Sequence, residues 1–570
     1  MSSDFQISGT NSTALFTLKI HRGDGMALLA MNWKKGLPPN DFVGFAIEYK
    51  EPGGNKFFAL KNRLSFAKAG GLDPNTLSTL RSPIQKFRWV HFPRNAELEG
   101  DFIYRVAPVF MNDRDELSAG DPQEVAIELR RETYPGKLNV AFTRGFVSSQ
   151  AFVDRYASIA PISTLIPDDA DKGLSFVPTH PKAKEALAWM GFEARHAIIE
   201  VLDRAIADKK AQVRVIAYDL SEPDIVSRLE RLGSRLKILI DDSGDHGAAD
   251  SGESQSAQRL SLSAGAVNVK RHHMGQLQHN KTIVVEGPNL KTAVCGSTNY
   301  TWRGFFVQAN NAIILRGRNA IKPFVAAFDD YWNNETPVKF GKTASAGWTN
   351  LGLDGVNAKA AFSPHSTANV LLQSIADDVG TKTTSNLFYS LAFLYQTPGV
   401  MLDAIKKVSD NSKLFVYGIS DRKVGGIDLQ KPDGNVSPVF PSALNNNLPA
   451  PFKSEPIGGS GNRMHHKFLV VDFNKPTARV YLGSYNFSGT ADTKNGENLL
   501  LIRNRRIAVS YMIEALRLID HYHFRVAQQE AKRARSILHL AKPPRQPGEK
   551  PWWSKYYSDP LKIRDREMFA

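Results

Sequence analysis

A pattern of polar and small residues occurs twice in this chain, and such a duplication constrains the fold more than any other feature of the sequence. The first copy contains, in order, His279, Lys281, Glu286, Gly296-Ser297, Asn299, Asn310 and Asn311. The second contains His465, Lys467, Asp472, Gly483-Ser484, Asn486, Glu497 and Asn498. From His to Ser is 18 residues in one copy and 19 in the other, and from the Asn of the Gly-Ser turn to the last Asn is 12 in both. The matched spacing predicts two equivalent structural units.

Each His-x-Lys opens an apolar run with the character of a buried strand. Because side chains alternate along a strand, we expect His465 and Lys467 on one face and His466 on the other. One imidazole beside one fixed positive charge suits an anion. Each copy supplies only half of the groups needed to cleave a phosphodiester, so we expect both copies to form one active site that is complete in a monomer.

These motifs resemble the signature of the phospholipase D superfamily, His-x-Lys-x4-Asp followed by Gly-Ser-x-Asn, with two copies per active site. The second copy fits fully, and the first has Glu286 in place of Asp. The resemblance covers roughly residues 137–570. It implies a duplicated α/β/α sandwich that hydrolyses phosphodiesters through a phosphohistidine intermediate, with no metal and no cofactor.

The chemistry assigns a role to each part of the pattern. The lysines hold nonbridging oxygens, the amides donate hydrogen bonds, and the two histidines supply a nucleophile and a general acid. The candidate catalytic residues are His279, Lys281, Glu286, Asn299, His465, Lys467, Asp472, Asn486 and Glu497. The candidate substrate-binding residues are Ser297, Asn310 and Ser484, although the serines could instead only shape their turns.

The two histidines differ in the partners available within their own copies. His465 has carboxylates in its copy, Asp472 and Glu497, which would stabilise an imidazolium, whereas His279 has the amide Asn310. This reasoning predicts His279 as the nucleophile and His465 as the general acid. A partly degenerate site would show the same substitutions.

Residues 1–135 are expected to form an all-β sandwich. Alternating or aromatic-rich runs separated by turn signals lie within residues 14–20, 27–33, 42–49, 86–92, 102–110 and 124–129. Trp33 and Tyr104 resemble residues of fibronectin type III or immunoglobulin-like domains, in which such a Tyr bonds back to a turn between strands. We expect this domain to bind a protein partner or to cap the next domain.

From Leu138 onward, strands alternate with helical stretches, which predicts an α/β sheet. The first repeat is expected at 136–345, with helices over 182–209 and 321–332, and the second at 346–525, with a closing helix over 507–524. Residues 241–253 are acidic and Gly-rich but lack the ligand order of an EF-hand, so we expect a disordered loop rather than a calcium site. Further loops are expected at 421–449 and 454–462.

Residues 526–570 form a basic, aromatic tail containing Trp552, Trp553, Tyr556 and Tyr557. Stacking on bases and contact with a lipid interface are both open to such a sequence. We expect instead that the tail packs on the catalytic unit.

Net charge and cysteine content bear on partners and location. The charge of +15 suits a polyanion, and the block Gly483–Asn498 looks closest to the bacterial endonuclease branch, so we expect a nucleic acid substrate rather than a phospholipid. The alternatives are a phospholipase D acting on lipids and a nucleic-acid-binding protein with an impaired site. The single Cys295 excludes an intramolecular disulfide, and the absence of a signal-like or membrane-spanning segment predicts a cytoplasmic protein.

Overall fold

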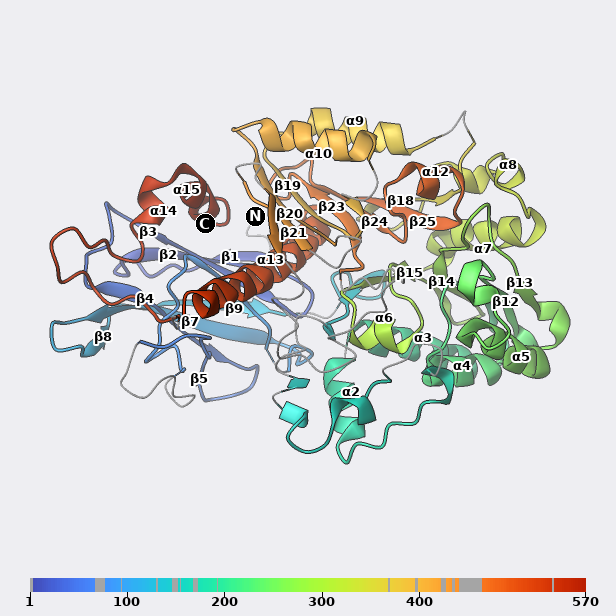
Figure 1. Ribbon diagram of the computed structural model, residues 1–570, viewed down its shortest axis with the longest axis horizontal. Helices are drawn as coiled ribbons and strands as arrows, with labels where there is room; N and C mark the ends of the chain where they lie inside the picture. Colours follow the sequence, from blue (N-terminus) through green and yellow to red (C-terminus); the bar gives the residue numbers. More distant parts are fainter. Residues whose placement is uncertain are drawn as a thin grey trace. The chain divides into compact units, whose positions relative to one another are not determined.

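The computed structural model describes residues 4–66, 77–93, 95–129, 132–145, 152–153, 155–167, 173–191, 193–366, 370–394, 398–421, 427–432, 436–439, 464–535 and 538–570. The chain divides into two compact units (Figure 1). The β unit comprises Met1–Thr133 and Val509–Ala570, and the α/β unit comprises Tyr134–Ala508. Among the described helices, none combines the length and the apolar character that a bilayer crossing requires.

The β unit holds two antiparallel sheets, of order β1-β2-β3-β6 and β5-β4-β7-β8, with β9 paired to β7. The strands are β1 Gln6–Ser8, β2 Phe16–Arg22, β3 Ala27–Trp33, β4 Phe42–Lys50, β5 Phe58–Ala59, β6 Arg88–His91, β7 Asp101–Met111, β8 Leu117–Ala119 and β9 Gln123–Glu128. The six runs read from the sequence are confirmed as strands, and the three short ones carry too few residues to show a period. The hydroxyl of Tyr104 contacts the ring Nδ1 of His91 rather than a turn, and the likeness to a fibronectin type III domain stays a prediction.

The C-terminal tail belongs to the β unit, which corrects the expectation that it packs on the catalytic unit. Trp553 is buried in the core of the β unit among residues of both sheets, and the indole of Trp552 donates to the carbonyl of Phe42. Helices α14 (Lys555–Ser558) and α15 (Pro560–Glu567) follow, and Asp565 accepts a hydrogen bond from Arg88. The aromatic residues of the tail therefore complete a core.

The α/β unit contains two mixed sheets, whose central strands are buried on both faces. The first has the order β10-β16-β15-β14-β11-β12-β13 and the second β17-β18-β25-β24-β23-β19-β20-β21-β22. The first consists of β10 Leu138–Phe142, β11 Gln212–Ala217, β12 Leu236–Ile240, β13 Val269–Arg271, β14 Lys281–Glu286, β15 Lys291–Gly296 and β16 Asn311–Arg316. The second consists of β17 Thr349–Asn350, β18 Asn357–Ser363, β19 Asn386–Leu391, β20 Phe415–Asp421, β21 Ile427–Gln430, β22 Val436–Val439, β23 Lys467–Val471, β24 Arg479–Gly483 and β25 Glu497–Arg503. Six neighbouring strands of the first sheet match six of the second in spatial order. They are β10-β16-β15-β14-β11-β12 in the first sheet and β18-β25-β24-β23-β19-β20 in the second.

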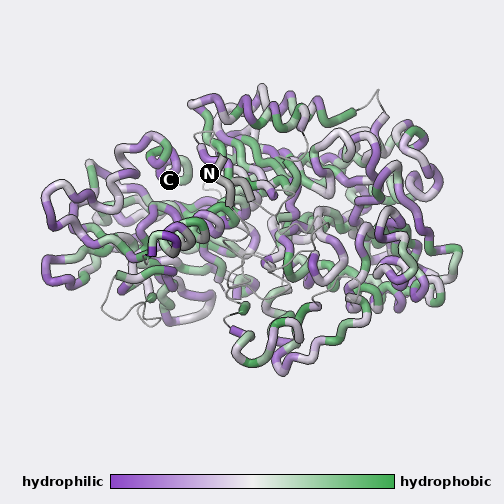
Figure 2. Tube along the Cα trace, in the orientation of Figure 1, coloured by the Kyte–Doolittle hydropathy of each residue, from purple (hydrophilic) through white to green (hydrophobic). Residues whose placement is uncertain are grey.

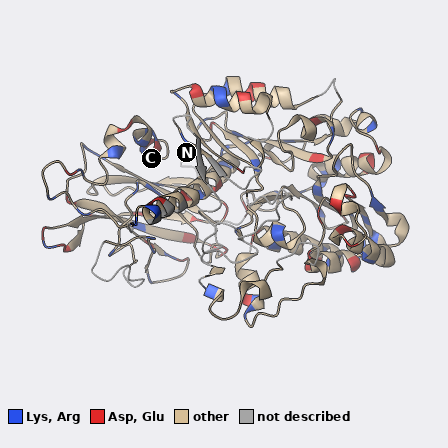
Figure 3. Cartoon of the chain, viewed as in Figure 1, with Lys and Arg blue, Asp and Glu red and all other residues tan. Residues whose placement is uncertain are grey.

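Ten described α-helices lie wholly in this unit, and several of them contact strands of the sheets. They are α2 Ala183–Met190, α3 Ala194–Ala207, α4 Pro223–Glu230, α5 Gly252–Ala264, α6 Trp302–Phe306, α7 Arg318–Asn333, α8 Pro337–Phe340, α9 Leu372–Lys382, α10 Val400–Asp410 and α12 Gly489–Thr493. The central strands are mainly hydrophobic (Figure 2), and charged residues are concentrated on helices and loops (Figure 3). Continuous apolar strands of this kind need cover on both faces, which the helices supply.

Four sequence-based expectations need correction. The helix expected over 182–209 is split into α2 and α3 at Gly191, and the closing helix α13 extends over Arg505–Arg533, with the unit boundary at Ala508 rather than residue 525. Residues 241–253 are ordered and contain a short 3-10 turn followed by the start of α5. Within the expected loop at 421–449, β21 and β22 form, while residues 440–449 and the expected loop at 454–462 lie outside the described residues.

Candidate active site

The two His-x-Lys segments meet in the α/β unit where strands β14 and β23 begin. The ring centroids of His279 and His465 are 6.2 Å apart, with the ring planes inclined by 72°. Both side chains are almost fully buried. A separation of this size lets one phosphate lie within reach of both rings, as one shared site requires.

Each histidine is held by a residue from the other repeat. His279 Nδ1 lies 2.8 Å from Glu497 Oε2, and His465 Nδ1 lies 2.8 Å from Asn310 Oδ1. The neighbouring residues cross in the same way: Asn498 Nδ2 donates to Asn280 Oδ1 at 2.8 Å, and Asn311 Nδ2 lies 3.4 Å from His466 Nδ1. The carboxylate expected to support His465 therefore supports His279, which overturns the premise of the sequence argument about the two rings.

These contacts define the tautomer of each ring. A carboxylate or amide oxygen accepts, so Nδ1 carries hydrogen in both histidines and Nε2 is left for chemistry. The oxygen of Asn310 is identified by its other contacts, because Ser297 Oγ donates to it at 3.0 Å and Nδ2 donates to the carbonyl of Gly304 at 3.0 Å.

The two lysines are placed alike. Lys467 Nζ donates to the carbonyl of His465 at 2.8 Å, and Lys281 Nζ donates to the carbonyl of His279. An ammonium has three hydrogens, so each lysine keeps two for a ligand. Lys281 also lies over the ring of Tyr218, 4.5 Å from its centroid, which fixes the direction of its side chain.

Burial shifts the ionisation of this group of cations. Desolvation lowers the pKa of His279 despite the attraction of Glu497, and it lowers the pKa of His465 further, with Lys467 and Lys281 adding repulsion. Desolvation also lowers the pKa of Lys281 to about 8 and that of Lys467 well below its usual range. Because an anion placed among these groups would stabilise their charged forms and oppose all four shifts, the site favours an anionic ligand.

The Gly-Ser turns and their serines shape the site from within. Gly296 and Gly483 have φ of +132° and +145°, and a Cβ at either position would collide with the carbonyl oxygen of Asn311 or Asn498. Ser297 Oγ donates to Asn310 and accepts from the amide of Asn311, while Ser484 Oγ accepts from the amide of Asn498 at 2.9 Å. Ser297, Ser484 and Asn310 thus make their contacts within the protein, which favours the turn-shaping role over substrate binding.

The two amides of the Gly-Ser-x-Asn motifs differ in environment. Asn299 is buried, and its Nδ2 donates to Asp219 Oδ2. Asn486 is partly exposed, and its Oδ1 has no hydrogen-bond partner among the described residues. Both amides keep at least one hydrogen for a ligand.

Glu286 and Asp472 lie away from the histidines, at the far ends of β14 and β23, which corrects their assignment as catalytic residues. Five or six strand residues place them about 20 Å from the site. Glu286 is exposed and pairs with Arg214 at 3.1 Å. Asp472 accepts the backbone amides of Thr384, Ser385 and Asn386, so it anchors the start of β19.

Two aspartates that the sequence analysis did not single out, Asp241 and Asp421, hold the segments that carry the histidines. Asp241 Oδ1 accepts the amide of Gln278 at 2.5 Å, and Asp421 Oδ2 accepts the amide of Met464 at 2.8 Å. Gln278 and Met464 directly precede the two histidines. Asp241 directly follows the apolar strand β12 and Asp421 ends the apolar strand β20, and this similar placement is the signal that would have identified the pair.

Known proteins match parts of the chain. Residues 199–332 and 396–518, together under half of the chain, match the family described as cardiolipin synthase, PLD-like domain. Phospholipase D from Rickettsia prowazekii (strain Madrid E) is 42% identical over 48 residues, and that from Rickettsia felis 40%, in each case 8% of this chain and 22% of the relative's length. The α/β unit is therefore similar to the phospholipase D superfamily in both repeats.

Solved structures also match. Phosphatidylserine synthase from Haemophilus influenzae Rd KW20 is 12% identical with a TM-score of 0.40, over 65% of this chain and 93% of that one. Nuc from Salmonella typhimurium, described as a phospholipase D family member, is 26% identical with a TM-score of 0.20, over 24% of this chain and 87% of that one.

Proposed function

We propose that this chain is a phosphodiesterase of the phospholipase D type that cleaves its substrate through a phosphohistidine. The observation that carries the proposal is the crossed arrangement at the two histidines. It leaves the Nε2 atoms of two rings whose centroids are 6.2 Å apart, with the ammonium groups of Lys281 and Lys467 bonded to the carbonyls of the same two histidines.

The reaction needs two transfers. Nε2 of one histidine attacks phosphorus while Nε2–H of the other gives its proton to the departing alkoxide. The second ring, now neutral, takes a proton from water, the hydroxide attacks phosphorus, and the P–N bond breaks. Lys281 and Lys467 hold the nonbridging oxygens throughout.

His279 is proposed as the nucleophile, for a reason different from that drawn from the sequence. Attack places a positive charge on the imidazole, and the carboxylate of Glu497 stabilises that charge better than an amide would. Among the described residues, the partners of His465 Nδ1 are neutral, namely Asn310 and the carbonyl of Ser297, and the lowered pKa of His465 makes it a stronger acid once a phosphate anion has restored its proton.

A nucleic acid is the proposed substrate. The net charge of +15 supports a polyanion, and the block Gly483–Asn498 supports the endonuclease-like branch. The names of the curated relatives instead favour a phospholipid, so both classes enter the test.

The test incubates purified protein in EDTA with labelled DNA, labelled RNA and phosphatidylcholine vesicles in parallel, with His279→Asn as the control. We expect cleavage of a nucleic acid that weakens steeply between 50 and 200 mM salt, by about 10³-fold or more if six phosphates are contacted. Turnover of phosphatidylcholine with no cleavage of DNA or RNA would replace the nuclease assignment. Activity that survives in His279→Asn would refute the proposed site.

A further inference from the structure

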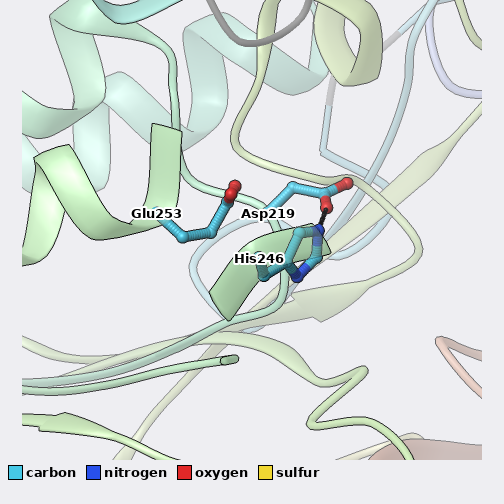
Figure 4. A group of neighbouring side chains, drawn as sticks. All are labelled: Asp219, His246 and Glu253. Atoms are coloured by element: carbon cyan, nitrogen blue, oxygen red, sulfur yellow. Dashed lines mark ion pairs between the residues drawn. The ribbon is translucent and has the colours of Figure 1, made fainter. Parts of the chain in front are cut away.

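A histidine outside the repeated pattern lies between two aspartates beside the first half-site. His246 Nδ1 is 2.7 Å from Asp241 Oδ2, and His246 Nε2 is 2.9 Å from Asp219 Oδ1. Figure 4 shows Asp219 and His246 directed at each other, with the carboxylate of Glu253 nearby. Both ring nitrogens therefore face a carboxylate oxygen.

The loop that carries His246 is held firmly. Arg271 Nη2 donates to the backbone carbonyls of His246 at 2.6 Å and Asp241 at 3.1 Å. Ser251 Oγ donates to the same His246 carbonyl at 2.8 Å, and Ser243 Oγ donates to Asp241 Oδ2 at 2.5 Å. The imidazole thus occupies a built position.

Both aspartates accept hydrogen bonds from residues of the first half-site. Asp241 accepts the amide of Gln278, the residue before His279, and Asp219 accepts the side-chain amide of Asn299. The ring of Tyr218 lies between His246 and His279, with centroids 4.6 and 4.7 Å away. His246 thereby touches the supports of His279, Asn299 and Lys281.

The chain Asp241–His246–Asp219 is ionised. Burial alone would lower the pKa of His246, but its hydrogen bonds to Asp219 and Asp241 raise it to about 11. Burial likewise opposes ionisation of Asp219, yet the contact with His246 keeps the pKa of that carboxyl lowered. The cluster therefore contributes one positive and two negative charges next to a site for an anion.

We propose that His246 is a positioning residue of the first half-site, and that its charge offsets the two aspartates so that a phosphodiester anion can bind between Lys281 and Lys467. The inference rests on the proposed function. Without the imidazolium, two buried carboxylates would raise the negative potential where the phosphate must lie, at an effective dielectric far below that of water. The position matching Asp219 in the second sheet is Phe393, which follows β19 as Asp219 follows β11, so the second half-site keeps one such carboxylate, Asp421, where the first has two.

The same side chains could also be considered as a metal site, because one ligand atom each from Asp219, His246 and Glu253 lies within 4.8 Å of the others. Both nitrogens of His246 are already engaged with carboxylates, so a metal would have to displace a proton held at a pKa of about 11. The geometry thus favours an internal ion cluster.

The test measures binding of tungstate, a phosphate analogue, by calorimetry and hydrolysis of bis(p-nitrophenyl) phosphate. The variants are His246→Gln, Asp219→Asn, the double variant, and Glu253→Gln as the matched neighbour. We expect His246→Gln to weaken tungstate binding at least tenfold and to lower kcat/KM about 100-fold, a loss typical of displaced supporting groups. The double variant restores the charge balance and should recover most of the binding, whereas Glu253→Gln should change binding little, because burial and the charge of Asp219 raise the pKa of that carboxyl and so reduce its ionisation.

Three outcomes count against the inference. If His246→Gln and the double variant lost tungstate affinity equally, the role of His246 would be structural. If His246→Gln bound tungstate as tightly as the wild type, His246 would have no role in anion binding. Activity that requires added Zn²⁺ or Mn²⁺ and is lost in Glu253→Gln would replace it with a metal site. If His246→Gln does not fold, the inference is tested with Asp219→Asn. Removal of one carboxylate beside the retained imidazolium should tighten tungstate binding in that variant, and unchanged binding would contradict the inference. Wild-type protein that binds tungstate but hydrolyses no phosphodiester would refute the proposed function while leaving the binding comparison valid.

Discussion

The two half-sites have the same backbone arrangement but different charged side chains. In both, a His-x-Lys segment enters a central strand, a lysine bonds the carbonyl of its own histidine, and an aspartate holds the amide before that histidine. The first half-site has Glu497 behind its histidine and an imidazolium beside it, whereas the second has the amide Asn310. A symmetric scaffold therefore carries an asymmetric set of charges, which suits a reaction whose two steps need different groups.

The largest expected effect separates the two histidines. His279→Asn removes the covalent route and should be inactive with any leaving group. His465→Asn should lose about 10²–10⁴-fold on a substrate with an alkyl leaving group and recover by a similar factor on a nitrophenyl phosphodiester, which needs little protonation. Steady-state rates with both substrates provide the measurement. Rescue of His279→Asn instead would exchange the two roles.

The next effect concerns the residues behind the rings. Glu497→Gln removes the negative charge that would stabilise a phosphoimidazolium on His279 in the proposed mechanism, and it should lower kcat about 100-fold, with KM little changed. Asn310→Asp places a carboxylate behind both histidines and should raise the pKa of His465, which weakens it as an acid. Quench-flow measurement of the phosphoenzyme distinguishes them: Glu497→Gln should slow its formation with a good leaving group, and Asn310→Asp should not. If the two variants behaved identically, the assignment of His279 as nucleophile and His465 as general acid would be wrong.

A smaller effect appears in the pH profile. Burial lowers the pKa of Lys281 to about 8, so the free enzyme loses this charge as pH rises through that value, and kcat/KM should decline above it. Lys281→Arg, which stays protonated, should have a lower rate but no decline near pH 8. A decline that persists in Lys281→Arg would assign it to another group, with Lys467 the first candidate.

The smallest effects belong to the acidic residues that end the two motif strands. Asp472→Asn weakens charge-assisted bonds to three backbone amides and should lower the free energy of unfolding by about 1–3 kcal/mol. Glu286→Gln breaks one exposed ion pair and should cost at most about 0.5 kcal/mol. Denaturant melts measure both, and the activity of the folded enzyme should stay at the wild-type value. A loss of activity in either variant would return these residues to the catalytic list.

Features that depend on neighbouring residues were predictable from the sequence, whereas contacts between residues far apart in the chain were not. Strand order and the His-x-Lys strands were predictable because apolar periodicity is local and the pattern is repeated. The crossing of Glu497 to His279 was not, since spacing within a repeat is silent about contacts between repeats. For the same reason the sequence did not predict the packing of the tail, because Trp553 contacts core residues more than 500 positions earlier in the chain. The contacts of His246 with Asp241 and Asp219 were also missed, because the acidic composition of residues 241–253 is typical of a loop.

The crossed histidine contacts also have a consequence for the timing of synthesis. His279 leaves the ribosome 218 residues before Glu497, which at 5–20 residues per second corresponds to roughly 10–45 s. Until then the first imidazole lacks its carboxylate and the second motif is incomplete. The first half-site can therefore be assembled only after Glu497 has been synthesised.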